Sequence, residues 1–348
     1  MYQVILPVVI AFLVAFISTP IVLRLAKKWG AMDAPCDRKV HTFAMPRMGG
    51  LAIYAGFIAA VLATQTIDAK LAGILIGCTI IVLLGIADDI KGLSPKVKLA
   101  GQTLAALVVV LFGVKVSILT NPFADVLFLE NFKLAIPFTV LWIVGVTNAV
   151  NLIDGLDGLA AGTSGIAAVT IGVVAFLEGH LAVAVLAIIL AASVFGFLPF
   201  NFNPAKIFMG DTGSMFLGFT LSVLAVVGLT KSTTVISVFI PVVILGIPIF
   251  DTMYAITRRF LNGTPIFQAD KEHLHHQLLN MGLTHKQTVL VIYAVNLCLG
   301  SSAVLMSLIA PPQAVVILIG LTVIMLLGMN HLSFAAFSRR QKAKNFGG

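Results

Sequence analysis

The chain has 348 residues, of which 59% are hydrophobic and only 10% are charged. A soluble domain typically carries about 25% charged residues, so this composition excludes an ordinary soluble enzyme, a disordered chain and a nucleic-acid-binding protein. The formal net charge is +8, but in a membrane protein the side on which the charges lie matters more than their total. The three cysteines are too few and too scattered for a disulfide framework or a metal cluster.

Eleven apolar runs follow one another along the chain and predict an all-α polytopic membrane protein. A membrane-spanning helix needs about 20 predominantly apolar residues, so the apolar content suffices for about eleven transmembrane helices. We expect one integral membrane domain over residues 1–348, without internal repeats. The runs lie near 3–25, 48–66, 70–87, 98–114, 135–147, 160–177, 180–200, 213–230, 233–256, 287–310 and 313–332.

The basic residues predict the orientation of these spans. An odd number of spans places the two termini on opposite sides of the membrane. One side of the membrane would hold 18 of the 22 Lys and Arg residues if five loop segments lie there together with the C-terminus. These segments are near 26–47, 88–97, 148–159, 201–212 and 257–286. The positive-inside rule makes this side cytoplasmic, with the N-terminus outside and the C-terminus in the cytoplasm. The long outer segment near 115–134 predicts a small external hairpin.

Ten of the fourteen acidic residues fall on the same predicted side as most basic residues, so charge balance does not explain them. Two of these acids, Asp88 and Asp89, end an apolar run. Adjacent carboxylates at a helix end that faces water can bind a divalent cation or provide a base. A solvated helix end is the alternative, although acids at a helix C-terminus oppose the helix dipole.

A second stretch carries amide and carboxylate side chains at intervals of three residues: Asn148, Asn151, Asp154 and Asp157. On a helix this row winds slowly round one face, so the four groups project into one region. Burying them without partners would cost several kcal/mol per group. A bound cation or a polar substrate is therefore the favoured interpretation, and hydrogen bonding between helices is the alternative.

Three further segments contain candidate ligands for a metal ion or a phosphate. Asp211 opens an apolar run between two glycines, where it is either an N-cap or a metal ligand beside a phosphate at a helix N-terminus. His273, His275 and His276 suit no common structural zinc site, but imidazoles can donate hydrogen bonds to a pyrophosphate. Arg47 and Arg259 are weaker phosphate candidates, because positive-inside topology alone would also supply them.

Six motifs, in order, resemble the polyprenyl-phosphate N-acetylhexosamine-1-phosphate transferase family over nearly the whole chain. They are PRMGG at 46–50, ADD at 87–89, NAVNLIDGLDGLAAG at 148–162, NPAKIFMGDTGS at 203–214, GIPIFDT at 246–252 and HLHH at 273–276. PRMGG and HLHH favour the branch that starts wall teichoic acid and related polymers over the phospho-N-acetylmuramoyl-pentapeptide transferase of peptidoglycan synthesis. One departure is the segment 88–92, which lacks the third acid of the Asp-Asp-x-x-Asp version, so no role of that acid carries over.

The resemblance implies a reaction, a cofactor and a location. N-acetylglucosamine 1-phosphate would move from UDP-N-acetylglucosamine to undecaprenyl phosphate, giving undecaprenyl-diphospho-N-acetylglucosamine and UMP. Mg²⁺, with Mn²⁺ as the alternative, would neutralise the diphosphate as its bond breaks. The protein would lie in the lipid bilayer of the bacterial plasma membrane as a multi-pass protein with a cytoplasmic active site. A homodimer is left open.

The resemblance also implies roles for the candidate residues. Asp88 or Asp89 would orient or deprotonate the lipid phosphate, and Asp211 would bind the metal ion with help from Asn151 or Asp88. The candidates for binding the sugar nucleotide or its diphosphate are Asn148, Asp154, Asp157, His273, His275, His276, Arg47 and Arg259. A secondary transporter and a non-catalytic sugar-nucleotide sensor are the rival functions. Transporters place their coupling acids near the bilayer midplane, whereas these acids lie at predicted helix ends.

Overall fold

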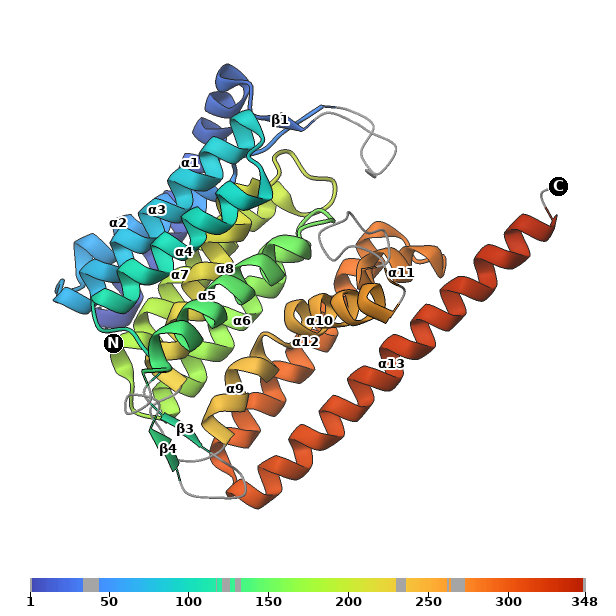
Figure 1. Ribbon diagram of the computed structural model, residues 1–348. Coiled ribbons are helices and arrows are strands. Elements are labelled where there is room, and N and C mark those ends of the chain that lie inside the picture. Colours follow the sequence, from blue (N-terminus) through green and yellow to red (C-terminus); the bar gives the residue numbers. More distant parts are fainter. Residues whose placement is uncertain are drawn as a thin grey trace.

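The computed structural model describes residues 2–33, 44–116, 118–120, 126–128, 133–229, 236–261, 263 and 273–346. Figure 1 shows a bundle of helices with two small strand pairs. The elements in chain order are α1 (Tyr2–Trp29), β1 (Met32–Asp33), β2 (Met45–Pro46), α2 (Gly50–Thr64), α3 (Ala69–Lys91), α4 (Pro95–Leu111), β3 (Ile118–Thr120), β4 (Val126–Phe128), α5 (Ala135–Leu152), α6 (Leu159–Leu177), α7 (Leu181–Asn201), α8 (Gly210–Leu229), α9 (Ile236–Ile244), α10 (Gly246–Leu261), α11 (Leu274–Asn280), α12 (His285–Leu308) and α13 (Pro311–Phe346).

The helices coincide with the predicted apolar runs, and ten of the eleven runs overlap one helix each. Among the described residues, eight helices are long and apolar enough to cross a membrane: α1, α3, α5, α6, α7, α8, α12 and α13. The apolar helices α2 and α4 are shorter, with 15 and 17 residues. An all-α polytopic membrane protein is therefore confirmed, while the count of eleven spans and the orientation of the termini stay predictions.

The run near 233–256 forms two helices instead of the single predicted one. Helix α9 ends at Ile244 and α10 begins at Gly246. Pro241 and Pro248 flank this break, and each lacks the N–H group that a continuous helix needs. Figure 1 shows that α10 departs from the direction of α9 and runs toward α11. The break therefore directs α10 toward α11, where Asp251 of α10 accepts a hydrogen bond from Leu274 N.

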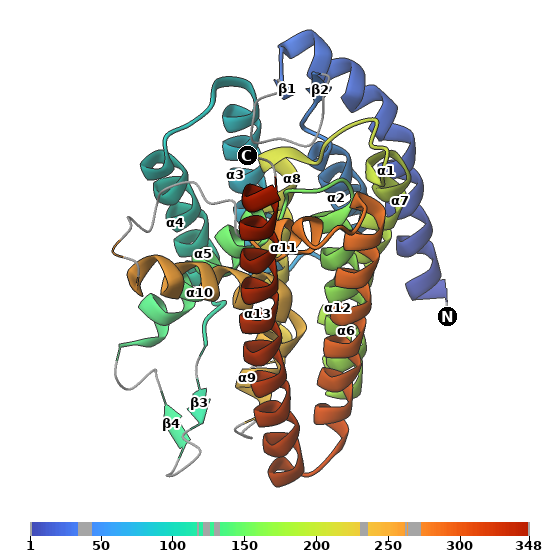
Figure 2. The same cartoon turned by 90° about the vertical axis from the view of Figure 1, so that its right-hand side faces the viewer.

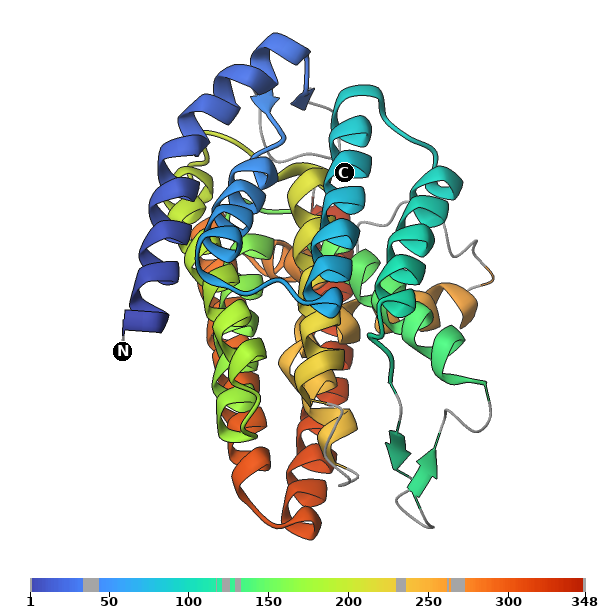
Figure 3. The ribbon, with the colours of Figure 1, turned by 90° about the vertical axis from the view of Figure 1, so that its left-hand side faces the viewer.

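Helix α8 is the centre of the bundle. Of its most apolar 18-residue window, 83% is buried, and it contacts α2, α3, α5 and α6. Figure 3 shows α1, α2 and α7 on the N-terminal side of the molecule, where α1 packs against the other two. Helix α13 is peripheral, since only 6% of its window is buried and Figure 1 shows it at the edge of the bundle. Figure 2, in which this side faces the viewer, shows α13 in front, next to α12. The N-terminus of α8 is thus surrounded by other helices.

The hairpin predicted near 115–134 is present as an antiparallel pair of β3 and β4, in which Leu119 lies opposite Leu127. Residues 117, 121–125 and 129–132 of that prediction lie outside the described residues. In Figure 1 this pair lies at one end of the bundle, and β1 lies at the other end. The loops that carry predicted site residues share the end with β1, because they line one cavity there.

The helices extend into several of the predicted loops. Helix α3 continues to Lys91, so Asp88 and Asp89 lie in its last turn. Helix α5 continues to Leu152, which places Asn148 and Asn151 on a helix and leaves 153–158 as the loop before α6. The predicted loop 257–286 contains α11, and its residues 262 and 264–272 lie outside the described part of the chain.

Candidate active site

The first turn of α8 rests on the carboxylate of Asp89. Asp89 Oδ1 accepts a hydrogen bond from Asp211 N at 3.0 Å. Asp89 Oδ2 accepts one from Thr212 N at 3.0 Å and one from Thr212 Oγ1 at 2.6 Å. The unpaired N–H groups of a helix N-terminus favour such an anion. Gly210 has φ +71°, and a Cβ on it would lie 2.6 Å from Asp89 Oδ2, so this position requires glycine.

The PRMGG segment packs against the chain that leads into α8. Phe208 N donates to Pro46 O at 2.8 Å. Gly50 N donates to Met209 O, also at 2.8 Å. A Cβ on Gly50 would lie 2.0 Å from Gly213 Cα, so α2 and α8 approach at a distance that only glycines permit. Gly50 of this motif therefore allows α2 and α8 to pack closely.

Arg47, from the same motif, contacts the C-terminal end of α3. Its Nε and Nη2 donate to Asp89 O at 3.1 and 3.0 Å. Its Nη1 lies 3.8 Å from Asp33 Oδ1 on β1. A cation at a helix C-terminus is favourable because the last carbonyls carry partial negative charge. Arg47 thus holds the end of α3, and its predicted contact with a phosphate stays a prediction.

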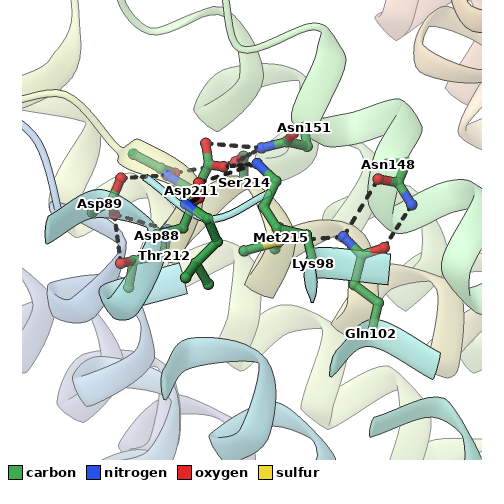
Figure 4. Close-up of polar contacts among 12 residues, drawn as sticks. Asp88, Asp89, Lys98, Gln102, Asn148, Asn151, Asp211, Thr212, Ser214 and Met215 are labelled. Atoms are coloured by element: carbon green, nitrogen blue, oxygen red, sulfur yellow. Dashed lines mark hydrogen bonds and ion pairs between the residues drawn. The ribbon is translucent and has the colours of Figure 1, made fainter. Parts of the chain in front are cut away.

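Lys98 joins two carboxylates from different helices, as Figure 4 shows. Its Nζ lies 3.1 Å from Asp88 Oδ2 and also forms an ion pair with Asp211 Oδ2. Asp88 Oδ1 accepts a hydrogen bond from Leu93 N at 2.6 Å. Helices α3, α4 and α8 therefore each contribute one charged side chain, and we call this group the Asp88–Lys98–Asp211 cluster.

The two asparagines on α5 have different partners, which Figure 4 also shows. Asn151 Nδ2 donates to Asp211 Oδ1 at 3.1 Å and to Ser214 Oγ at 2.7 Å. Asn148 Nδ2 donates to Gln102 Oε1 on α4 at 2.6 Å. Asn151 therefore orients Asp211, whereas Asn148 links α5 to α4.

The Asp88–Lys98–Asp211 cluster offers the oxygen ligands that Mg²⁺ prefers. Oδ2 atoms of Asp88 and Asp211 converge on the Lys98 ammonium, so both already face one positive centre. Within the described ranges, no group of three or more His, Cys, Asp or Glu side chains could hold a metal ion. Mg²⁺ in proteins often takes one or two carboxylates and completes its shell with water and substrate phosphates. The donor set fits a Mg²⁺ ion bound in that way.

A cavity of about 490 Å³ lies beside the cluster, and Asp211 belongs to both. This volume is within the usual range for small-molecule sites, about 300–1,000 Å³. The predicted site residues in its wall are Arg47, Asp89, Asp154, Asp157, Asp211 and His276. The other predicted residues lie outside the wall: Asp88, Asn148, Asn151, His273, His275 and Arg259.

The loop 153–158 contributes two acids to the cavity. Asp157 Oδ2 accepts hydrogen bonds from Asn203 Nδ2 and Ala205 N, both at 3.0 Å, so Asp157 fixes the segment after α7. Burial, together with the carboxylates of Asp211, Asp89 and Asp157, raises the pKa of Asp154 well above its usual value. The negative charge around Asp154 therefore favours a cation there, or protonation of the carboxylate.

The three predicted histidines occupy different environments. His273 Nδ1 lies 2.8 Å from Asp251 Oδ2 on α10, and Asp251 Oδ1 accepts from the backbone N–H that begins α11. His275 is buried against the loop 153–158, because a Cβ on Gly155 would lie 2.4 Å from His275 Nε2. Burial, and then His276 and His273, lower the pKa of His275 well below its usual value. His276 lines the cavity.

Lys98, Gln102 and Asp251 are among the residues in these contacts that were absent from the predicted site. Lys98 and Gln102 interrupt an apolar run at a spacing of four residues, which places them on one face of α4. That spacing was the available signal. Asp251 lies within an apolar run, where an acid needs a partner, and this was the signal for its contact with His273.

Comparison with known proteins identifies the family. Residues 71–229 match the family model described as Glycosyl transferase family 4. The chain is 48% identical over 310 residues to the probable undecaprenyl-phosphate N-acetylglucosaminyl 1-phosphate transferase of Bacillus subtilis. The matched region covers 88% of this chain and 86% of that protein. It is 37% identical to the decaprenyl-phosphate N-acetylglucosaminephosphotransferase of Mycobacterium leprae, over 81% of this chain and 78% of that protein.

A more distant relative supports the same assignment. The undecaprenyl-phosphate alpha-N-acetylglucosaminyl 1-phosphate transferase of Escherichia coli K12 is 28% identical, over 81% of this chain and 78% of that protein. The residues that the family model matches include the Asp88–Lys98–Asp211 cluster, the loop 153–158 and α8. The chain therefore belongs to the polyprenyl-phosphate N-acetylhexosamine-1-phosphate transferases of glycosyl transferase family 4, and it is a sugar-1-phosphate transferase.

Proposed function

We propose that this enzyme transfers N-acetylglucosamine 1-phosphate from UDP-N-acetylglucosamine to undecaprenyl phosphate, with release of UMP. The observation that carries the proposal is the position of Asp211, which lies in the wall of the cavity and in the Asp88–Lys98–Asp211 cluster. A transfer between two phosphates needs two adjacent sites that share the reacting centre. The names of the relatives supply the two substrate classes.

The cavity is the proposed site of the sugar nucleotide. Asp154 and Asp157 would accept hydrogen bonds from the uridine or the sugar, and His276 would donate to the diphosphate. His273 and His275 would act indirectly, because neither lies in the cavity wall: His273 contacts Asp251, and His275 packs against Gly155, which belongs to the wall. The loop between α7 and α8 would close the same site through Asn203.

The lipid phosphate is proposed to bind on the other side of Asp211, at Asp88 and Lys98. The Lys98 ammonium would pair with the phosphate oxygens, and a charge-assisted contact of this kind is among the stronger hydrogen bonds in proteins. Asp88 would orient the phosphate or accept its proton. We assign this part to Asp88 because both carboxylate oxygens of Asp89 already accept hydrogen bonds from α8.

Asp211 and Asp88 are the proposed ligands for Mg²⁺, or for Mn²⁺ in its place, and the bound cation would neutralise the diphosphate as the bond to UMP breaks. Asn151 would keep Asp211 in position through its hydrogen bond to Oδ1. Lys98, which contacts both carboxylates, would shift its contacts toward the phosphates when the substrates bind.

The proposed location is the bacterial plasma membrane, with the cavity on the cytoplasmic face, where the reaction would be the first membrane step of a cell-surface polymer such as wall teichoic acid. The bias of basic residues supports this orientation. Labelling of single introduced cysteines in intact cells, with a thiol reagent that does not cross the membrane, tests this orientation. We expect Lys96→Cys, beside the cluster, to be protected and Lys70→Cys, at the other end of α3, to react. Light scattering of the purified protein would test the homodimer.

The experiment that tests the reaction is release of UMP by the purified full chain with undecaprenyl phosphate and Mg²⁺. UDP-N-acetylglucosamine, UDP-N-acetylgalactosamine and UDP-N-acetylmuramoyl-pentapeptide are supplied in parallel. We expect release with the first donor alone. Release with the pentapeptide donor would instead place the enzyme in peptidoglycan synthesis. If folded protein supplied with lipid released no UMP from any donor, the proposed reaction would be wrong.

A further inference from the structure

Gly158 connects the cavity loop 153–158 to α7, α6 and α12 through backbone hydrogen bonds. It has φ +78°, a left-handed conformation that turns the chain into α6. Gly158 N donates to Asn201 Oδ1 at 3.2 Å. The Gly158 carbonyl accepts two hydrogen bonds, one from Gly162 N at 2.8 Å and one from the hydroxyl of Tyr293 on α12. The N–H group and the carbonyl group of Gly158 therefore both have hydrogen-bond partners.

Tyr293 reaches this carbonyl because α6 has no side chain in its way. A Cβ on Gly162 would lie 1.9 Å from Tyr293 Oη and 2.0 Å from Cζ, so only glycine admits the ring. The same loop is contacted from α11, where His275 packs on Gly155. Helices α11 and α12 therefore contact the loop 153–158 at its two glycines, Gly155 and Gly158.

The acid in the middle of this loop depends on its backbone for its position. In the part of the chain that the structure describes, no hydrogen bond to the Asp154 carboxylate is present, although it lines the cavity. Asp157, in contrast, is fixed by two hydrogen bonds from the segment after α7. Asp154 is therefore placed by the fold of residues 153–158, and the Tyr293 contact is one of the bonds that fix this fold.

We infer that Tyr293 is a positioning residue for binding of the sugar nucleotide: its hydroxyl holds Gly158 so that the loop presents Asp154 to the cavity. This inference rests on the proposed function. Tyr293 does not touch the substrate in this role and takes no part in the chemistry at Asp88 and Lys98. Loss of the hydroxyl should therefore weaken donor binding while acceptor binding and the transfer step stay unchanged.

Tyr293→Phe in the purified full chain tests the inference. One intramolecular hydrogen bond typically contributes about 1 kcal/mol, so we expect the KM for UDP-N-acetylglucosamine to rise about fivefold. We expect kcat at saturating donor and the KM for undecaprenyl phosphate to change by less than about twofold. The dissociation constant of UDP-N-acetylglucosamine, measured by calorimetry without acceptor, should rise as much as the KM.

Tyr54→Phe is the matched control. Tyr54 Oη lies 2.7 Å from Thr79 Oγ1, between α2 and α3, so the control also removes one tyrosine hydroxyl contact between helices. A merely structural role would lower the melting temperature of both variants and leave both donor KM values alike, which would overturn the inference. Failure of the proposed function is a different outcome, since the wild-type chain itself would then neither bind UDP-N-acetylglucosamine nor release UMP.

Discussion

Thr212 donates two hydrogen bonds to Asp89 Oδ2, one from its backbone N–H at 3.0 Å and one from its hydroxyl at 2.6 Å. These bonds seat the N-terminus of α8 on the end of α3. We predict that Asp89→Asn lowers the free energy of unfolding by about 2 kcal/mol, because the amide removes a charged acceptor from the helix N-terminus. The melting temperature in detergent measures this loss, and turnover should fall with it.

Asp88→Asn provides the contrast to that variant. The Asp88 carboxylate contacts Lys98 and accepts a hydrogen bond from Leu93 N, whereas the backbone N–H groups that begin α8 donate to Asp89. We expect a melting temperature close to that of the wild type and a loss of turnover of about 100-fold or more, typical for removal of an acid–base group. Equal melting temperatures for the two variants would contradict the division of roles between the two neighbouring acids.

Lys98 is expected to compete with the divalent cation for Asp88 and Asp211. A unit charge about 4 Å from a carboxylate interacts with it by about 4 kcal/mol at an effective dielectric constant near 20. Solvent screens part of this interaction because the Lys98 side chain is 21% exposed, so we predict that Lys98→Gln tightens Mg²⁺ binding by about tenfold or more. We also expect lower turnover, because the lipid phosphate loses its cationic partner. Binding of Mn²⁺, followed by electron paramagnetic resonance, measures the affinity independently of activity.

Lys96→Gln is the control for the electrostatic argument. Lys96 is exposed in the first turn of α4 and lies two residues from Lys98. Its removal changes the net charge equally, but screening by solvent should leave Mn²⁺ binding nearly unchanged. Weaker Mn²⁺ binding in Lys98→Gln than in this control would show that Lys98 supports the cation site instead of competing with it.

The apolar runs predicted the helices because length and hydropathy are local properties, but the contacts of the polar residues depend on tertiary packing. Adjacent residues on a helix point about 100° apart, so Asp88 faces Lys98 while Asp89 faces α8. The sequence placed both acids at a helix end and could not distinguish their partners. Their division of labour becomes visible only when α4 and α8 are packed against α3.

The row of Asn148, Asn151, Asp154 and Asp157 also shows that spacing along the sequence does not determine tertiary contacts. The spacing of three residues predicted one common region, but Asn148 pairs with Gln102 and Asn151 meets Asp211. Of this row, Asp154 and Asp157 line the cavity. Which neighbouring helix lies beside each turn is not encoded in that spacing. The prolines around Leu245 were visible in the sequence, yet hydropathy averaged over them and predicted one helix where the structure has two.

The contact between Gly50 and Gly213 sets the distance between α2 and α8. A Cβ on Gly50 would lie 2.0 Å from Gly213 Cα, and backbone cannot yield as a flexible side chain can. We predict that Gly50→Ala lowers the free energy of unfolding by about 3 kcal/mol. Gly145→Ala on α5 is the matched control, since nothing lies within 4 Å of a Cβ there. Similar melting temperatures for the two variants would contradict the close helix contact.

His275 should make stability depend on pH. Burial, and then His276, His273 and His285, lower its pKa in the folded state, whereas the unfolded chain has the ordinary histidine pKa of about 6.5. Below that pH the unfolded state binds the extra proton, so the free energy of unfolding falls as the pH drops from about 6.5 toward the folded-state pKa. We expect the melting temperature to decrease between about pH 7.5 and pH 5.5.

His275→Gln should flatten this dependence, because glutamine does not titrate. The variant loses packing against Gly155, so its melting temperature will be lower at every pH, and the informative quantity is the slope with pH. His180→Gln, at the turn before α7, provides the same substitution away from the cavity. If the slopes of His275→Gln and His180→Gln were equal, the acid sensitivity would arise elsewhere, since the argument depends on burial that disfavours the charged form of the His275 imidazole.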